Sequence, residues 1–309
     1  MAKFWKVMRN IAIGFVAVVT LGAIALKACS KMPAVPNEFQ DRFEYTGELE
    51  KKYAADGVLK VEEFTQRDSD ERIKLYQVWY PEDLKSSSRS WPLVVMANGT
   101  GVQASRYKAI FRHLASWGFI VVGNEDENSW DGYSTSKSLD FVLDLNQDSG
   151  SIFYGKVNTD AIGLAGHSQG GVAVFNAATN YDNSSRYKAL YAASCTGLEL
   201  AQALQWPYDV TKVKAPTLMT AGTLKADAEL ICKLEALTDN YNGIEGQPVM
   251  MGRIKNIDHG DVLMKGDAYQ TAWFCYFLKG DELAGHCFLG DDAEMFNNDQ
   301  WQDVQHKNL

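Results

Sequence analysis

Short apolar runs alternate with amphipathic segments along most of the chain. Two runs with strand character come first, at residues 58–64 and 73–81, and a polar segment rich in Asp, Ser and Arg separates them. Two such runs joined through turn residues predict an antiparallel hairpin. Residues 93–96, Leu-Val-Val-Met, form a continuous apolar run. This run is typical of a strand that is buried on both faces of a parallel sheet.

Strands and helices are then predicted in alternation up to residue 278. The expected strands are 119–122, 162–164, 190–193, 217–220 and 249–252, and the expected helices are 107–117, 138–146, 171–178, 226–237 and 262–278. In the first helix, Tyr107, Ile110, Phe111 and Leu114 recur at helical spacing. This order predicts right-handed βαβ units and an α/β fold with a mostly parallel, doubly wound sheet.

One domain accounts for the folded part of the chain. We expect a single α/β domain over residues 56–309, preceded by a linker and lead-in segment over residues 31–55. In the tail beyond residue 278, we expect Phe296, Trp301 and Val304 to pack as a closing helix.

The first 30 residues have the pattern of a signal peptide or of an N-terminal membrane or lipid anchor. Lys3, Lys6 and Arg9 precede residues 11–26, which carry no charged side chain. A basic segment before an apolar one predicts export, with the remaining chain outside the cytoplasm. Residues 26–30 resemble a bacterial lipoprotein processing site at Cys29, although Lys27 departs from that pattern. We expect a protein that is secreted or anchored in the cell envelope, as a lipoprotein or at the periplasmic face of the inner membrane, with membrane contact through this segment only.

Composition and charge argue against some classes of partner, in particular nucleic acids and metal ions. The chain has 46% hydrophobic and 22% charged residues and a formal net charge of -9. A phosphate backbone requires a face rich in Lys and Arg, so the sequence indicates no nucleic-acid partner. Four cysteines lie outside the first 30 residues. In an oxidising compartment they predict two disulfides, and proximity in the sequence favours the pairs Cys275–Cys287 and Cys195–Cys232. The alternative is four buried thiols. None has the Cys-x-x-Cys spacing of a zinc site, and we expect no metal.

Residues 166–170, Gly-His-Ser-Gln-Gly, carry the main chemical signal. An apolar run precedes them and a helix-compatible run follows. Strand, tight turn and helix in this order is the context in which Gly-x-Ser-x-Gly marks a nucleophile; the alternative is a glycine-rich turn with a solvated serine. Gly166 and Gly170 are expected where side chains would collide with the neighbouring strand and helix. Ser168 is therefore the candidate nucleophile, at the carboxyl edge of the sheet and at the positive end of a helix.

His259 is the candidate general base. It follows the predicted strand 249–252 and precedes a helix, which places it at the same sheet edge as Ser168. An imidazole can accept the serine proton and return it to the leaving group. His167 is expected to pack or to hydrogen-bond locally.

The carboxylate that orients the base is expected between residues 169 and 258, because the chain order of this motif is serine, acid, histidine. Asp227 is preferred because it follows a predicted strand and begins a helix. Glu229 and Asp209 are the alternatives, and Asp258 is too close to His259 in the chain to reach around it.

Two backbone donors are expected to stabilise the oxyanion of the reaction. One is the N–H of Gln169, directly after the nucleophile. The other comes from residues 98–101, Asn-Gly-Thr-Gly, where two glycines allow the backbone to turn inward. Thr100 or Gly101 would supply this second N–H.

Taken together, these motifs resemble the α/β-hydrolase family. The residues that carry the resemblance are 78–81, 94–101, 113–122, 165–171, 215–218 and 258–259. From about residue 53 to about residue 278, the chain is similar to the branch of dienelactone-hydrolase-like proteins, chlorophyllases and cutinase-type polyester (PET) hydrolases. The resemblance implies an α/β-hydrolase fold and a serine carboxylic-ester hydrolase without a cofactor, with a small or polymeric ester as substrate.

The resemblance also implies roles for seven residues. They are a catalytic triad, two oxyanion donors and two tryptophans beside the acyl group, namely Ser168, His259 and Asp227; Thr100 and Gln169; and Trp206 and Trp130. A serine peptidase-like or other acyl-transfer hydrolase of this fold, or a non-catalytic binding module, are alternative functions, because a fold alone does not determine function. The sequence leaves the oligomeric state open.

Overall fold

The structure, a computed structural model, describes residues 34–309. The expected signal or anchor, residues 1–30, lies outside the described residues. Val35–Leu309 forms one compact unit. Part of the expected linker therefore belongs to this unit: Phe39 and Tyr53 are buried, and helix α2 (Glu48–Ala54) packs against helix α9 (Asp267–Lys279). The folded unit begins at Val35 rather than at residue 56 because these apolar side chains complete the core.

Within the described residues, nine strands form one sheet in the order β1-β2-β4-β3-β5-β6-β7-β8-β9. Their bounds are β1 Val61–Arg67, β2 Leu75–Pro81, β3 Trp91–Ala97, β4 Ile120–Asn124, β5 Val157–His167, β6 Tyr187–Ala193, β7 Thr217–Gly222, β8 Val249–Ile254 and β9 Trp301–Lys307. β1 and β2 form the predicted antiparallel pair, and β2 also pairs antiparallel with β4. From β4 to β8 the neighbouring strands are parallel, which confirms the α/β-hydrolase arrangement.

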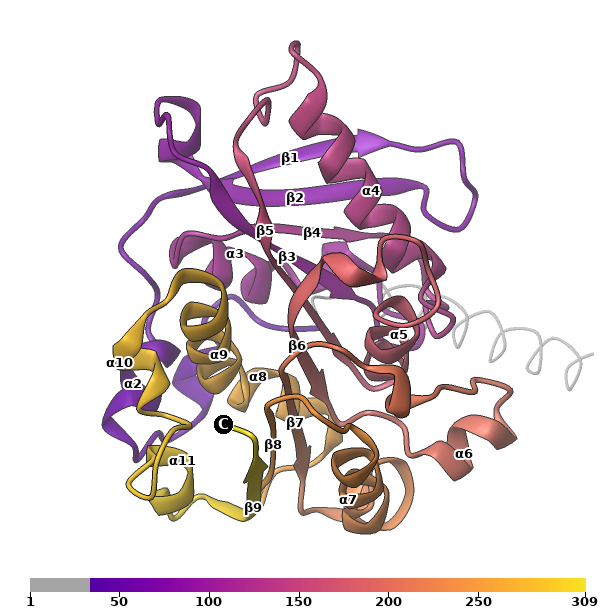
Figure 1. The fold of residues 1–309 in the computed structure, drawn as a ribbon, viewed down its shortest axis with the longest axis vertical. Helices are drawn as coiled ribbons and strands as arrows, with labels where there is room; N and C mark the ends of the chain where they lie inside the picture. The colour runs from indigo at the N-terminus through magenta and orange to yellow at the C-terminus, as the bar shows by residue number, and fades with distance from the viewer. Residues whose placement is uncertain (1–33) are drawn as a thin grey trace, which may run out of the picture. The chain divides into compact units, whose positions relative to one another are not determined.

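Two layers of helices cover the sheet (Figure 1). α3 (Lys108–Ser116) and α9 lie on one side, with α2 and α10 (Glu282–Gly285) packed outside α9. α4 (Tyr133–Gln147), α5 (Gln169–Ala177) and α7 (Leu234–Gly243) lie on the other. Short helices complete the connections: α6 Leu198–Ala203, α8 His259–Lys265 and α11 Glu294–Asn297.

One hydrophobic cluster lies between the sheet and the second helix layer, and further fully buried side chains such as Phe111 and Phe274 lie on the side of α3 and α9. Strand residues such as Val95, Val122 and Leu164 are fully buried in this cluster and pack with Val172 and Phe175 of α5. Each large apolar side chain that leaves water contributes ~1.5–3 kcal/mol to folding. This packing fixes α5 against β5, and with it the turn between them.

Two of the expected helices are broken. The helix predicted over 226–237 divides into a five-residue π-helix, Asp227–Ile231, and α7. The helix predicted over 262–278 divides into α8 and α9 at Gly266, where a Cβ would lie 2.4 Å from the Tyr191 hydroxyl. At Gly266 the approach of Tyr191 leaves no room for a side chain, and periodicity along the chain reports neither break.

The predicted closing helix is wrong. Trp301 and Val304 belong to β9, which pairs antiparallel with β8, and Phe296 lies in the short helix α11. Pairing gives the backbone groups at the edge of β8 their hydrogen-bond partners. The Arg253–Asp303 ion pair, at 2.7 Å, joins the two strands.

The described cysteines contain no disulfide. Cys195, Cys232, Cys275 and Cys287 are free and buried, so the two predicted bridges are wrong and the alternative of four buried thiols holds. Burial raises the pKa of Cys195 to about 12, so its thiol stays protonated at neutral pH.

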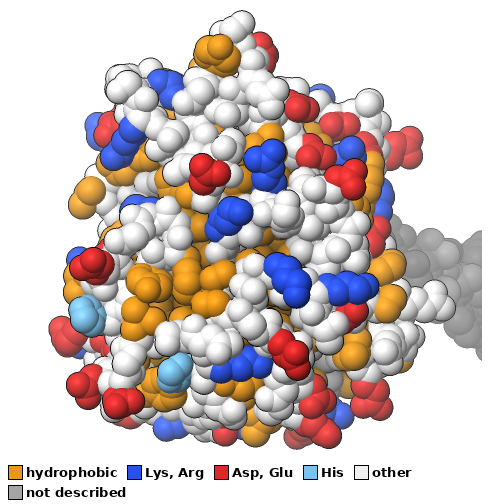
Figure 2. Space-filling view, in the orientation of Figure 1, with side chains coloured by type: hydrophobic (Ala, Val, Ile, Leu, Met, Phe, Trp, Pro, Cys, Tyr) orange, Lys and Arg blue, Asp and Glu red, His pale blue; other side chains and the backbone are white. Residues whose placement is uncertain are grey.

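Features of membrane-spanning helices and of metal sites are absent from the described residues. No helix within residues 34–309 is long and apolar enough to span a bilayer, and no cluster of His, Cys, Asp or Glu in that range is arranged to hold a metal ion. Figure 2 shows hydrophobic side chains gathered in the middle of one face, with Lys and Arg beside them and acidic side chains mostly nearer the rim.

Candidate active site

The turn between β5 and α5 holds Ser168 in a strained conformation. Its φ is 62° and its ψ is -120°, a backbone geometry that a non-glycine residue adopts at a cost of ~1–3 kcal/mol. The Ser168 N–H donates to the carbonyl of Ala193, at the end of β6, over 2.9 Å. β5 and α5 therefore present the serine at the carboxyl edge of the sheet.

The glycines of the turn are required by close backbone approach. A Cβ on Gly166 would lie 2.2 Å from the carbonyl oxygen of Gly170, and one on Gly170 would lie 2.4 Å from that of Ala97. Backbone atoms cannot move aside as a flexible side chain can. The close backbone approaches that the sequence predicted at Gly166 and Gly170 are therefore present in the fold.

Asp227 and His259 come together from the ends of two adjacent strands. Asp227 follows β7 as the first residue of the π-helix, a short form that is frequent at functional sites, and His259 begins α8 after β8. Asp227 Oδ1 lies 2.7 Å from His259 Nδ1, and Asp227 is fully buried. A carboxylate at Nδ1 holds the proton there and leaves Nε2 free to accept one.

The second carboxylate oxygen of Asp227 is also fully engaged. Oδ2 accepts hydrogen bonds from the Ser194 hydroxyl at 2.5 Å and from the Gly222 N–H at 2.7 Å. These donors compensate the buried charge and orient the carboxylate toward His259.

The alternative acids lie elsewhere. Glu229 is exposed on the π-helix, and Asp209 accepts from Thr211 and pairs with Lys212. Asp258 accepts the backbone N–H groups of His259 and Ala226, so it caps α8 rather than contacting the imidazole.

His167 contacts the candidate base itself, which the sequence did not indicate. Its Nε2 lies 2.7 Å from the carbonyl oxygen of His259, and the two rings are 4.5 Å apart. Because a carbonyl only accepts, Nε2 carries the proton. Burial and the neighbouring His259 lower the pKa of His167 to about 4, so the ring is neutral. Adjacency to Ser168 was the only sequence signal for this residue.

The loop after β3 is held by its own side chains and by the loop after β4. The Asn98 amide donates to the carbonyl oxygens of Asn124 and Asp126. The Gly101 N–H, predicted as one of two possible second oxyanion donors, donates to the carbonyl of Glu127 over 2.9 Å in this structure. Thr100 is exposed at the tip of the loop.

The Gln169 side chain anchors the loop after β4. Its Oε1 accepts the Ser129 N–H at 3.0 Å, and its Nε2 donates to Asn128 Oδ1 at 3.1 Å. The buried Gln169 side chain thus holds the loop after β4 in place. The backbone N–H of Gln169 lies in the first turn of α5.

The last turn of α5 holds the backbone at Trp130 and just after Trp206. Asn176, in its last turn, donates to the carbonyl oxygens of Trp130 and of Pro207, which follows Trp206. Eight residues of helix separate Asn176 from Ser168, about 12 Å along the axis. Both tryptophans pack against the core.

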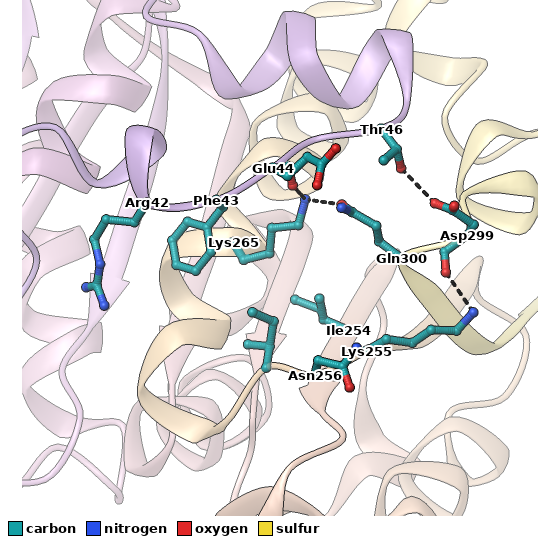
Figure 3. Close-up of a pocket in the computed structure, with 11 residues that line it drawn as sticks. Arg42, Phe43, Glu44, Thr46, Ile254, Lys255, Asn256, Lys265, Asp299 and Gln300 are labelled. Atoms are coloured by element: carbon teal, nitrogen blue, oxygen red, sulfur yellow. Dashed lines mark hydrogen bonds between the residues drawn. The ribbon is translucent and has the colours of Figure 1, made fainter.

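A buried cation anchors α8 at the end opposite His259. Lys265 is 3% exposed and its Nζ lies 2.9 Å from Glu50 Oε1. The same Nζ donates to the Glu44 carbonyl and to Gln300 Oε1, so segments from both ends of the described chain meet on this helix (Figure 3).

The geometry agrees with what a comparison with known families finds. The model of the PETase family, described as PET hydrolase-like, matches residues 54–297. A comparison with curated proteins gave no match. The matched range contains the strained serine turn and the Asp227–His259 pair. The chain belongs to the PET hydrolase-like family, an α/β-hydrolase branch whose members are hydrolases acting on esters.

Proposed function

We propose that the protein is a serine carboxylic-ester hydrolase that works through an acyl-enzyme. Ser168 would be the nucleophile, His259 the general base and Asp227 the group that orients the base. The observation that carries the proposal is the 2.7 Å contact between the buried Asp227 and Nδ1 of His259, at the sheet edge where the turn between β5 and α5 presents Ser168.

In the first half of the reaction, Ser168 Oγ attacks the ester carbonyl while His259 Nε2 accepts its proton. Asp227 stabilises the imidazolium that forms. The imidazolium then protonates the alkoxide leaving group, the C–O bond breaks, and the acyl group remains on Ser168.

A water molecule completes the cycle. His259 deprotonates it, the resulting hydroxide attacks the acyl carbonyl, and Ser168 leaves with its proton restored. The products are a carboxylic acid and an alcohol, so atoms and charge balance.

The oxyanion that forms twice in this cycle needs donors fixed in advance. We assign them to the backbone N–H groups of Gln169 and Thr100, because Gly101 and Gly99 use theirs on Glu127 and Tyr107. Each such donor lowers the barrier by ~2.7–4 kcal/mol. Since both are backbone groups, substituting the Thr100 side chain should change kcat little.

An ester assay tests the proposal. Purified chain should hydrolyse a short p-nitrophenyl ester, lose activity with Ser168→Ala, and be inactivated by a serine-directed phosphonate. Ser194→Ala is a matched control for loss of a buried hydroxyl: it removes one hydrogen bond to Asp227 and should reduce kcat without abolishing it. A folded protein with no activity on a panel of short and polymeric esters would overturn the assignment.

We further propose export, because Lys3, Lys6 and Arg9 precede the uncharged residues 11–26. Cell fractionation should recover the chain outside the cytoplasm. Recovery in the cytosol with the leader intact would contradict this.

A further inference from the structure

A groove lies at the edge of the sheet opposite the candidate active site. Its lining comes from the segment before β1, the start of β3 and the carboxyl ends of α3 and α9. Its volume is about 600 Å³, enough for a ligand with one or two rings. Because β3 and β4 begin here, the groove faces away from Ser168 and His259.

The lining combines aromatic and apolar surface. Trp91 and Trp117 contribute to it together with Leu59 and Val58, and Val58 is 98% exposed. Trp91 is 2% exposed and its Nε1 donor is buried without a hydrogen-bond partner. Gly118 has a φ of +91°, a backbone conformation that other residues rarely adopt, and lies beside Trp91 and Leu59.

Three cations line the same groove. The Arg89 guanidinium lies 3.6 Å from the centre of the Trp91 ring, and Lys279 Nζ donates to the Trp117 carbonyl at 2.7 Å. Lys52 is the third. Across residues 34–309, none of these three cations forms an ion pair with a carboxylate, whereas the Arg72 and Arg253 guanidinium groups each do. Asp56 is the one acidic residue of the lining.

We propose that this groove binds a hydrophobic carboxylate, an anion with an aromatic or short aliphatic body. The body would lie against Trp117, Leu59 and Val58, above the buried Trp91, and the carboxylate would pair with Arg89 and Lys279. In a chain of net charge -9, three cations without carboxylate partners beside an apolar surface complement a ligand that is apolar with one negative end. This inference goes beyond the proposed ester hydrolysis and does not depend on it.

Calorimetric titration with 2-naphthoate as the probe tests the proposal. The Ser168→Ala protein is used, so that the measurement needs no activity. We expect one naphthoate per chain, and no binding of the uncharged 2-naphthamide at the same concentrations. Arg89→Gln with Lys279→Gln should weaken naphthoate binding by about tenfold or more.

Two controls separate the groove from general charge effects. Lys188→Gln with Lys212→Gln removes the same charge from a different pocket and should leave the affinity within about twofold. Because Lys279 also holds Trp117, a second pair of variants avoids it: Val58→Glu should weaken binding and Val58→Gln should not. Equal affinity in Val58→Glu and Val58→Gln, or in the Arg89/Lys279 variant and the parent, would overturn the proposal.

Discussion

The imidazole of His167 donates a hydrogen bond from Nε2 to the backbone carbonyl of His259, over 2.7 Å. The residue before the candidate nucleophile thereby holds the backbone of the candidate base. β5 ends at His167 and α8 begins at His259, so this bond joins the two elements that must stay in register for proton transfer.

The first prediction concerns this hydrogen bond. His167→Phe keeps a ring beside His259 but removes the donor, so the His259 backbone loses one restraint. We expect kcat for a short ester to fall about tenfold, equivalent to ~1.4 kcal/mol of barrier, with a smaller change in KM. His286→Phe, at an exposed site, is the matched control and should keep parent kinetics. An unchanged kcat in His167→Phe would show that the bond does not position the base.

The second prediction concerns stability at low pH. His167 has a folded pKa of about 4, below the ordinary value of 6.5, because of burial and the neighbouring His259. Between these values the unfolded chain binds a proton that the folded chain does not, so stability is lost as pH falls from 6.5 toward 4. The loss from this group is roughly 3 kcal/mol.

Urea unfolding at pH 7 and pH 4.5 measures this dependence. Without the histidine, His167→Phe should show a smaller difference between the two pH values than the parent. The same difference in both proteins would exclude His167 as its source.

The third prediction concerns the acid. Asp227→Asn keeps the shape of the side chain but removes the charge that stabilises the imidazolium, so kcat should fall by roughly 10³–10⁴-fold. Glu229→Gln, two residues along the same π-helix, is the matched control and should retain activity. Loss of activity in Glu229→Gln alone would move the assignment to Glu229.

The fourth prediction concerns the turn glycine. In Gly170→Ala the new methyl would meet the Ala97 backbone at 2.4 Å, so the variant should unfold at a lower temperature by at least several degrees. A Cβ on Gly260 meets nothing within 4 Å, and Gly260→Ala should be as stable as the parent or more so. Equal melting temperatures for Gly170→Ala and the parent would contradict the packing of β5 and α5.

The fifth prediction concerns the buried ion pair between Lys265 and Glu50. Lys265→Met leaves Glu50 buried without its cation and should cost ~3–5 kcal/mol of unfolding free energy. The double variant with Glu50→Gln should recover part of this loss. Lys255→Met, which removes only a hydrogen bond to the Asp299 carbonyl, should cost ~1 kcal/mol in the same urea titration. Similar losses for both single variants would argue against an important buried pair.

The sequence alone determined the alternation of strands and helices and the serine turn. These depend on local properties: apolar runs in β3 and β5, and glycines on either side of Ser168. Asp227 and His259 were also predictable as candidates, because each follows an apolar strand and residues at the carboxyl ends of parallel strands meet at one edge.

Only the tertiary structure decided the features that join distant parts of the chain. The contact of His167 with His259, the engagement of Gly101 by Glu127, and the pairing of β9 with β8 join segments that no local pattern connects. The close approach of Tyr191 at Gly266, between α8 and α9, likewise depends on a neighbour distant in the sequence. Periodicity reports which face of a segment is apolar; it does not report which other segment satisfies its backbone or fills the space beside it.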